Sequence, residues 1–375
     1  MGNVGPNRLF PIAESIRCLR VSEVYMQKKT RVLVTGAGGF IGHHLTRYLT
    51  ERGYWVRGVD IKGPEFDATT ADEFKLLDLR QWESCVEATK DVDQVYGLAA
   101  NMGGIGFIEN NKAVIIRDNT LINLQSIEAA RVNGVKQYLY TSSACIYPAY
   151  LQKDTNVTPL KEEDAYPADA EDGYGWEKLY MERICRHYRE DFGLDTRIVR
   201  FHNIFGPQGT YDGGREKSPA AICRKVAMAD DHDTIEVWGD GEQTRSYCYI
   251  DDCVEGIYRL MQSSYVEPLN LGQDRMLSIN ELVDIIAGIA GKKISKRYDL
   301  TKPQGVRGRN SDNTRLKEAL EWEPGISLED GLQRTYAWIA DELRTQSMEI
   351  VDSTYSTPSN VINHDLGAAK TRSTK

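Results

Sequence analysis

The sequence of 375 residues lacks the features that mark membrane proteins, disulfide-rich proteins and zinc ribbons. No apolar run approaches the length of about 18 residues that a membrane-spanning helix needs. The seven cysteines are odd in number and never occur as CxxC, which argues against a disulfide framework and against bound zinc. The six histidines do not cluster, so we expect no metal site. With no basic-then-apolar leader, these thiols favour the reducing cytoplasm.

Positive charge is also scarce. The 46 Lys and Arg residues are outnumbered by 55 Asp and Glu residues, which gives a formal net charge of −9. A field of this sign repels polyanions, so we expect neither a nucleic-acid partner nor a membrane partner. A small anionic ligand would need a local cluster of basic side chains. The apolar fraction of 41% and the charged fraction of 27% are those of a globular chain.

Strands and helices alternate through the first half of the chain. Short β-branched or apolar runs predict strands at residues 31–35, 55–60, 73–78, 94–100, 136–143 and 196–201. Helical patterns lie between them, with long ones at 110–132 and 174–188. Ser278 and Glu281 form a capping box that predicts a further helix. The alternation is typical of βαβ units and predicts an α/β fold with a Rossmann-type doubly wound parallel sheet.

The texture of the sequence divides the chain into four regions. Residues 1–29 show no periodicity and predict an N-terminal arm, whereas residues 30–202 predict the nucleotide-binding domain. Residues 203–345 have more Gly, Arg and Pro and shorter elements. They predict mainly a smaller C-terminal substrate-binding α/β lobe, with some elements returning to the sheet. Residues 346–375 are polar and predict a frayed tail.

A glycine-rich turn joins the first predicted strand to the first predicted helix. Gly36, Gly39 and Gly42 allow a tight turn there and the approach of backbone N–H groups to a pyrophosphate at the helix N-terminus. Asp60 ends the second strand, where a carboxylate can accept both ribose hydroxyls and would repel a 2′-phosphate. We therefore predict that residues 30–202 bind NAD rather than NADP.

Three other residues complete the predicted cofactor site. Phe40 and Ile41 belong to the glycine-rich turn and open the helix that follows it. Asp78 closes the third strand in the context LDLR, where it suits an adenine contact about as well as a solvated turn.

Tyr174 and Lys178 form a YxxxK pattern on a predicted helix. Four residues apart, they share one face of that helix. An ammonium and a nicotinamide cation nearby would lower the pKa of the phenol, which would make Tyr174 a usable proton acceptor. The chain holds this pattern three times, but only Tyr174 follows a strand that ends in a serine, Ser143. The serine hydroxyl and the phenol can therefore converge on one substrate oxygen.

These motifs resemble the extended short-chain dehydrogenase/reductase family. The matching segments are TGAGGFIG (35–42), SSACIYP (142–148), YGWEK (174–178) and HNIFGP (202–207). A further segment, GDGEQTRSYCYIDDCVEGI (239–257), extends the resemblance into the nucleotide-sugar branch. By this resemblance Ser143, Tyr174 and Lys178 serve hydride transfer. NAD binds to the first half of the chain and a nucleotide sugar to the second.

Two further residues bear on the reaction. Cys145 lies two positions after Ser143, and we expect it to face the same pocket from a continuing strand. Lys217 lies in a loop-like stretch. Taken singly, each fits a buried thiol or a solvated lysine better. Together they resemble the GDP-mannose 3,5-epimerase family through NMGGIGFIENN (101–111), SSACIYP, GGREKSPAAICRK (213–225) and GVRGRNSDN (305–313).

That family resemblance implies a reaction on GDP-mannose. Oxidation of C4 by tightly bound NAD gives a ketone, which acidifies the hydrogens on C3 and C5. Inversion then needs a base on one ring face and an acid on the other. By resemblance Cys145 is the base and Lys217 the acid, although the residues alone give only the pair. Hydride return to C4 closes the cycle and yields GDP-L-galactose, or GDP-L-gulose after inversion of C5 alone.

The resemblance also implies the substrate contacts and the oligomer. The contacts are Gly103, Ser143, Ala144, Cys145, Asn203, Glu216, Lys217, Ser218, Lys225, Gly241, Glu242, Gln243 and Arg307. Lys225, Arg307 and Arg245 suit a diphosphate in an otherwise acidic chain, and the alternative for each is an ordinary surface cation. The implied oligomer is a homodimer in which the helices at 110–132 and 174–190 pair across a two-fold axis.

Other functions remain open at this point. A GDP-L-fucose synthase-like enzyme also epimerises C3 and C5, but it would use NADPH and pair its cysteine with a histidine where this chain has Lys217. Another NAD-dependent nucleotide-sugar epimerase would need neither Cys145 nor Lys217, and a 4,6-dehydratase would need carboxylates after Ser143. A non-catalytic NAD-binding sensor or scaffold would not need Tyr174.

Overall fold

A seven-stranded parallel sheet forms the centre of the molecule in the computed structural model, which describes residues 1–2 and 29–355, with side chains to residue 346. The strand order is β11-β6-β5-β4-β1-β2-β3, and every neighbouring pair is parallel. The strands are β1 (Arg31–Thr35), β2 (Trp55–Asp60), β3 (Glu73–Leu76), β4 (Gln94–Gly97), β5 (Gln137–Ser143), β6 (Asp195–Phe201) and β11 (Leu269–Leu271).

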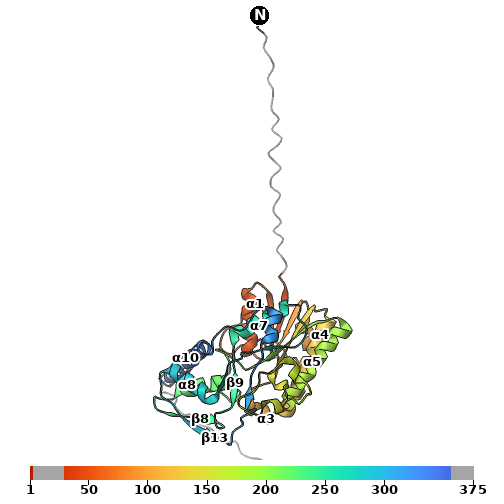
Figure 1. Ribbon diagram of the computed structural model, residues 1–375. Coiled ribbons are helices and arrows are strands. Elements are labelled where there is room, and N and C mark those ends of the chain that lie inside the picture. The colour runs from red at the N-terminus through yellow and green to blue at the C-terminus, as the bar shows by residue number, and fades with distance from the viewer. Residues whose placement is uncertain (3–28, 356–375) are drawn as a thin grey trace, which may run out of the picture.

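Helices cover both faces of this sheet (Figure 1). On one face lie α1 (Phe40–Glu51) and α7 (Ile250–Gln262), and on the other lie α2 (Trp82–Thr89), α4 (Lys112–Val132) and α5 (Asp172–Phe192). Successive residues of a strand point to opposite faces, so Val32 and Val34 join the first core while Leu33 joins the second. This arrangement confirms the predicted doubly wound α/β fold.

Some predicted element boundaries are wrong. β4 ends at Gly97 rather than at residue 100, because the Thr35 hydroxyl accepts the N–H groups of Leu98 and Ala99. β3 stops two residues before Asp78. The helix expected at 110–132 is confirmed as α4, which begins at Lys112. A separate short helix, α3 (Ile105–Asn110), precedes it and ends because Asn111 has a non-helical φ of −132°.

The second lobe packs beside the sheet and contains most of the remaining elements (Figure 1). Its helices are α6 (Ser218–Met228), α8 (Ile279–Ala290), α9 (Thr314–Leu320) and α10 (Leu328–Tyr355). Its strands are β8 (Thr234–Trp238), β9 (Thr244–Ser246), β12 (Met276–Ser278), β13 (Ser295–Asp299) and β14 (Gly308–Arg309), with β7 (Ile204–Phe205) and β10 (Cys248–Tyr249) at the junction. One hydrophobic core runs from Val32 in β1 to Ile339 in α10, so the two lobes share a packed interior.

The structure also bears on the predicted capping box and on the two predicted terminal segments. The capping box of α8 is confirmed, because Ser278 Oγ accepts the Glu281 N–H and Glu281 accepts the Ser278 N–H. The frayed tail predicted from residue 346 is wrong for residues 346–355, where α10 continues without a Gly or Pro to end it. The predicted tail beyond residue 355, and almost all of the predicted arm, lie outside the described residues.

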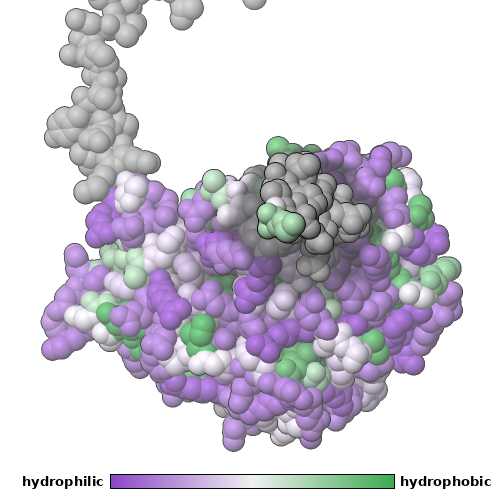
Figure 2. Space-filling model, turned by 90° about the horizontal axis from the view of Figure 1, so that it is seen from above, coloured by the Kyte–Doolittle hydropathy of each residue, from purple (hydrophilic) through white to green (hydrophobic). Residues whose placement is uncertain are grey.

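The outer surface is mainly hydrophilic on the face shown in Figure 2, with apolar residues scattered over it. No helix in the described part of the chain is long and apolar enough to cross a membrane.

A buried ion pair joins β6 to α5 behind the end of β5. The side chains of Arg200 and Glu182 are only 2% and 4% exposed, and Arg200 donates to both carboxylate oxygens at 2.9 and 2.7 Å. The Ser142 hydroxyl donates to the same carboxylate at 2.5 Å. Arg200 also donates to the Glu162 carbonyl at 2.8 Å and to the Tyr147 hydroxyl at 3.1 Å. This network therefore links β5, β6 and α5 to Tyr147 and Glu162.

Loss of this carboxylate should destabilise the protein strongly. Glu182→Ala leaves the Arg200 guanidinium buried without its counter-charge, and we expect the free energy of unfolding to fall by about 3–5 kcal/mol in urea denaturation. The matched control is Glu163→Ala, which breaks an ion pair with Arg315 whose side chains are 59% and 39% exposed and should cost less than about 1 kcal/mol. Equal losses in both variants would contradict the expectation.

Candidate active site

The glycine-rich turn after β1 forms a close-packed cradle. Gly36 has a φ of +72°, a conformation that favours glycine, and a Cβ at Gly42 would lie 2.0 Å from the Gly36 carbonyl oxygen. A Cβ at Gly38 would lie 2.2 Å from the Lys62 carbonyl oxygen. The N-cap of α1 is Gly39, which offers no side-chain cap to the first N–H groups of the helix. A small turn and an uncapped helix start are what a pyrophosphate group requires.

Asp60 ties the end of β2 to this turn. Its carboxylate accepts the N–H of Gly38 at 3.0 Å, of Ile61 at 2.7 Å and of Lys62 at 3.3 Å. Burial raises the pKa of Asp60, and these three donors oppose the rise. Beside the turn, the buried His43 Nδ1 has no hydrogen-bond partner among the described residues. The cradle, the carboxylate and this unpaired nitrogen fit a dinucleotide.

The other predicted cofactor residues are placed differently. Phe40 and Ile41 open α1 and pack partly against the first core. Asp78 lies beyond β3 and receives its hydrogen bonds from Arg80, which holds the pKa of Asp78 below its ordinary value. The adenine contact at Asp78 stays a prediction.

Tyr174 and Lys178 lie on the face of α5 that packs against β5. The Ser143 side chain lies close enough to the Tyr174 hydroxyl to lower the pKa of that phenol. Lys178 Nζ donates to the Thr141 carbonyl at 2.9 Å and lies 5.7 Å from the centre of the Tyr174 ring. Burial lowers the pKa of Lys178, which the Glu177 carboxylate opposes. Burial raises the pKa of Tyr174, so the protein groups alone do not produce the lowered pKa that we expect from the sequence.

The chain leaves β5 earlier than the sequence suggests. Cys145 does not lie on a continuing strand, because the Ser143 hydroxyl accepts the Cys145 N–H at 3.2 Å and starts a 3₁₀ turn at Ala144–Ile146. Ala144 is buried by this turn. Cys145 is the one described cysteine that is not fully buried. The sulfur therefore remains accessible next to Ser143.

Lys217 comes from the second lobe, at the N-cap of α6. The loop before it packs on the nucleotide-binding domain: the Gly104 N–H donates to the Arg215 carbonyl at 2.9 Å, and a Cβ at Gly104 would lie 2.5 Å from the Glu216 carbonyl oxygen. The Lys217 side chain is accessible, yet the protein that surrounds its ammonium lowers its pKa by desolvation. A negative charge on Cys145 would oppose this shift, so Cys145 and Lys217 lie within range of an electrostatic interaction.

The model of the NAD dependent epimerase/dehydratase family matches residues 32–272, from β1 through β11. The chain belongs to the NAD dependent epimerase/dehydratase family. Its cofactor is thus NAD, in agreement with the glycine-rich turn and Asp60.

Relatives within this family agree with the resemblance seen in the sequence. GDP-mannose 3,5-epimerase 1 of Oryza sativa subsp. indica is 48% identical over 336 residues, which are 89% of this chain and 88% of the relative. GDP-mannose 3,5-epimerase of Arabidopsis thaliana is 46% identical over 346 residues, 92% and 91% of the two chains. The solved UDP-glucose 4-epimerase of Thermotoga maritima, with UDP-glucose, superposes with a TM-score of 0.76 at 26% identity over 84% of this chain and 100% of that chain.

The remaining residues predicted to bind the sugar nucleotide come from both parts of this epimerase-family fold. Gly103 precedes α3, and a Cβ there would touch Phe107 at 3.0 Å. From the second lobe come Asn203, Glu216, Ser218, Lys225, Gly241, Glu242, Gln243 and Arg307. Asn203 has a φ of +45° and donates to the Ser246 carbonyl at 2.9 Å, while the Ser218 hydroxyl bonds to that of Tyr247 at 2.8 Å.

The three basic residues predicted for a diphosphate are held by their own lobe. Lys225 donates to the Glu236 carbonyl at 2.8 Å, and Arg245 donates to backbone carbonyls, including that of Val306 at 2.7 Å. Arg307 pairs with Asp240 at 2.9 Å. Contact of these cations with a diphosphate stays a prediction.

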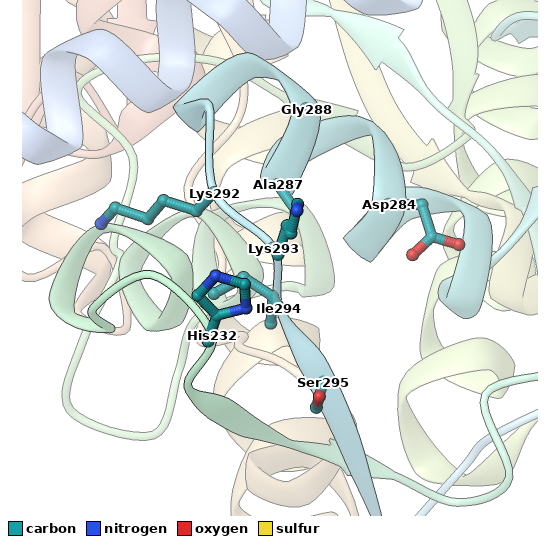
Figure 3. A pocket seen from close by; sticks show the side chains of 8 residues that line it. All are labelled: His232, Asp284, Ala287, Gly288, Lys292, Lys293, Ile294 and Ser295. Carbon is teal, nitrogen blue, oxygen red and sulfur yellow. The ribbon is translucent and has the colours of Figure 1, made fainter.

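The helix that begins after Lys217, α6, is capped at its C-terminus by Lys292. Lys292 lies at the rim of a pocket beneath α8 that none of the predicted site residues lines, and its side chain extends away from that pocket (Figure 3). Its Nζ donates to the carbonyls of Val226, Ala227 and Ala229 at 2.9, 3.2 and 2.7 Å. Lys292 therefore caps the C-terminus of the helix whose N-cap is Lys217.

Arg309, which lies among the basic side chains of 307–309 that the sequence predicts for an anion, makes a contact that sequence reasoning did not predict. Its guanidinium Nη1 lies 3.6 Å from Cys145 Sγ, in hydrogen-bond contact with the sulfur. The segment GVRGRNSDN contains it and was the available signal, but nothing in the sequence shows that β14 passes Cys145.

Gly175 should be intolerant of a side chain because α5 rests on the backbone at Cys145. A Cβ at Gly175 would lie 2.3 Å from the Cys145 carbonyl oxygen. Although alanine favours a helix by about 1 kcal/mol, we expect Gly175→Ala to lower the free energy of unfolding by about 1–3 kcal/mol in urea denaturation. Gly288→Ala in α8 meets nothing within 4 Å and should raise it by about 0.5–1 kcal/mol. A stabilised Gly175→Ala protein would show that the helix and the turn are not in contact.

Proposed function

We propose that this protein inverts C3 and C5 of GDP-mannose and forms GDP-L-galactose, with GDP-L-gulose as the product when C5 alone is inverted. The observation that carries this proposal is that Cys145, in the turn that Ser143 starts, interacts electrostatically with both Lys217 and Tyr174. The identity of 48% to a GDP-mannose 3,5-epimerase supports the same substrate.

The first task of the site is to oxidise C4 and later to reduce it. Bound NAD would supply the hydride acceptor for C4 oxidation and, once reduced, the hydride donor for C4 reduction. Tyr174 takes the proton of the C4 hydroxyl, and the neighbouring Ser143 hydroxyl holds the same oxygen. Lys178 is fixed by the Thr141 carbonyl near the phenol, where its positive charge favours the phenolate.

The second task is proton transfer on both faces of the sugar ring. The C4 ketone acidifies C3–H and C5–H, and the Cys145 thiolate removes the proton. Lys217 delivers a proton to the opposite face. Desolvation lowers the pKa of Lys217, which makes its ammonium a stronger acid than a solvated lysine. One thiol and one ammonium from different lobes therefore suffice for both inversions, provided that proton exchange with water restores the thiolate and the ammonium between them.

The reaction itself is the first test. In deuterated water with GDP-mannose and no added reductant, proton NMR should show loss of the C3 and C5 hydrogen signals and new GDP-hexose signals. Cys145→Ala should stop this exchange but leave the C4 oxidation, seen as nicotinamide absorbance in a single turnover. Tyr174→Phe should slow both by about 10²–10⁴-fold, because it removes the proton acceptor for C4.

Two results would count against this function. Unchanged GDP-mannose would remove the proposed substrate. Turnover that requires a 4-keto-6-deoxy sugar nucleotide and NADPH would instead identify a GDP-L-fucose synthase-like enzyme. Normal exchange in Cys145→Ala would make Cys145 a structural thiol.

The proposed homodimer is supported by the surface of α4 and α5. These helices pack side by side, with Asn123 Nδ2 donating to Glu177 at 2.6 Å, and lie at one edge of the molecule in Figure 1. They expose the apolar side chains of Val114, Ile116, Leu121, Val132, Trp176, Tyr180 and Phe192. Such a surface suits a two-fold interface between the helix pairs.

A charge on this surface should dissociate the dimer. We expect Trp176→Glu and Tyr180→Glu to sediment as monomers at concentrations at which the unsubstituted protein sediments as a dimer. Leu300→Glu is the control, because Leu300 is also exposed but lies after β13 in the second lobe. A dimer that persists in both α5 variants would place the interface elsewhere.

We also propose that the protein acts in the cytoplasm. Its six described cysteines are all free thiols, which a reducing compartment preserves.

A further inference from the structure

Arg309 occupies a buried position between the two lobes. It belongs to β14, which pairs with β9, and it is only 6% exposed. Its donors reach three side chains: Nε donates to Gln152 Oε1 at 2.7 Å, Nη2 bonds to the Glu171 carboxylate, and Nη1 contacts Cys145 Sγ at 3.6 Å. The guanidinium therefore connects the second lobe to the thiol.

The partners of Arg309 are themselves fixed. Gln152 is buried, and its amide nitrogen donates to the carbonyls of Tyr147 and Pro148 at 3.1 and 3.3 Å. The Glu171 N–H donates to the Cys145 carbonyl at 3.0 Å, and Glu171 is the N-cap of α5. The Arg309 guanidinium thus lies in a frame that already includes the backbone of Cys145.

The backbone of β14 has little freedom to move. A Cβ at Gly308 would lie 2.3 Å from the Asp154 carbonyl oxygen, and the Arg307 N–H donates to the Gln152 carbonyl at 3.0 Å. A rigid strand and two side-chain partners therefore direct one N–H of Arg309 at the sulfur.

We propose that Arg309 is a positioning residue for Cys145, which fixes the sulfur and favours its thiolate form during proton abstraction. This inference rests on the proposed function. In the step concerned, the C–H bond of the sugar breaks, an S–H bond forms on Cys145, and the electron pair moves into the enolate at the C4 ketone. Arg309 gains and loses no proton, because a guanidinium is not deprotonated in proteins. An N–H donated to an anion is stronger than one donated to a neutral atom, so the contact favours the charged sulfur.

Other charged groups also act on the thiol, and the experiment must distinguish their effects from that of Arg309. Cys145 interacts electrostatically with Lys217 from α6, Arg245 from β9, and Tyr174 and Lys178 from α5. Glu171 acts against Arg309 from the start of α5. The experiment therefore changes Arg309 alone and leaves the other cations in place.

The first measurement is the rate at which iodoacetamide alkylates Cys145 as a function of pH, followed by mass spectrometry. All proteins carry Cys18→Ser, since Cys18 lies outside the described residues. We expect Arg309→Met to slow alkylation at neutral pH by about tenfold and to move the profile to higher pH. Arg309→Lys keeps the positive charge but loses the forked guanidinium, so its alkylation rate should lie between those of the unsubstituted protein and Arg309→Met. Arg57→Met is the matched control, because Arg57 is equally buried and pairs with Glu73, and it should alkylate normally.

The second measurement compares the two halves of the reaction in the holoenzyme. We expect Arg309→Met to slow hydrogen exchange of GDP-mannose in deuterated water by about tenfold or more, while the C4 oxidation changes by less than about threefold. In Arg309→Met the Glu171 carboxylate loses its partner. The double variant Glu171→Gln/Arg309→Met removes that carboxylate and replaces the single variant in both measurements if the single variant does not fold.

The outcomes are separable. A folded Arg309→Met or double variant that alkylates at the unsubstituted rate overturns the inference, as does an equal loss of exchange and C4 oxidation. Alkylation needs no sugar nucleotide. If the unsubstituted protein fails to exchange GDP-mannose, only the proposed function fails, and the alkylation rates still decide whether Arg309 controls the thiol.

Discussion

The active site depends on the buried ion pair between Arg200 and Glu182. Two charges removed from water are stable only when paired and fully hydrogen-bonded, and here Ser142, Tyr147 and the Glu162 backbone complete the bonding. Glu182 belongs to α5, the helix of Tyr174 and Lys178, while Ser142 directly precedes Ser143. The ion pair therefore ties the helix of Tyr174 and Lys178 to the strand that ends in Ser143.

The second lobe contributes its chemistry through two short segments that cross to the nucleotide-binding domain. The loop before α6 supplies Lys217, and β14 supplies Arg309. These two cations differ in kind: Lys217 has a lowered pKa and can release a proton, whereas a guanidinium keeps its protons at any physiological pH. Cys145 contacts Arg309 and interacts electrostatically with Lys217. Of these two neighbours, Lys217 can exchange a proton, whereas Arg309 contributes only a fixed positive charge.

What the sequence predicts well is what depends on local pattern. The strand–helix alternation, the glycine-rich turn and the placement of Tyr174 above Lys178 follow from periodicities of two and 3.6 residues. The turn at Ala144–Ile146 does not, because a serine hydroxyl there competes with the strand for a backbone N–H. The contact between Arg309 and Cys145 joins residues far apart in the chain, so no local pattern contains it. The family resemblance marked the segment around Arg309 but not its function.

A chain with a net charge of −9 can still present basic side chains to an anion, provided that those side chains are not neutralised by neighbouring carboxylates. The described hydrogen bonds of Lys225 and Arg245 end on backbone carbonyls, which accept a proton donor without neutralising its charge. Arg307, by contrast, shares its charge with Asp240. In the second lobe, the hydrogen bonds of Lys225 and Arg245 thus involve no carboxylate, whereas Arg307 is paired with one. A diphosphate held there would add negative charge near Cys145, which makes a fixed cation such as Arg309 more important to a thiolate in that position.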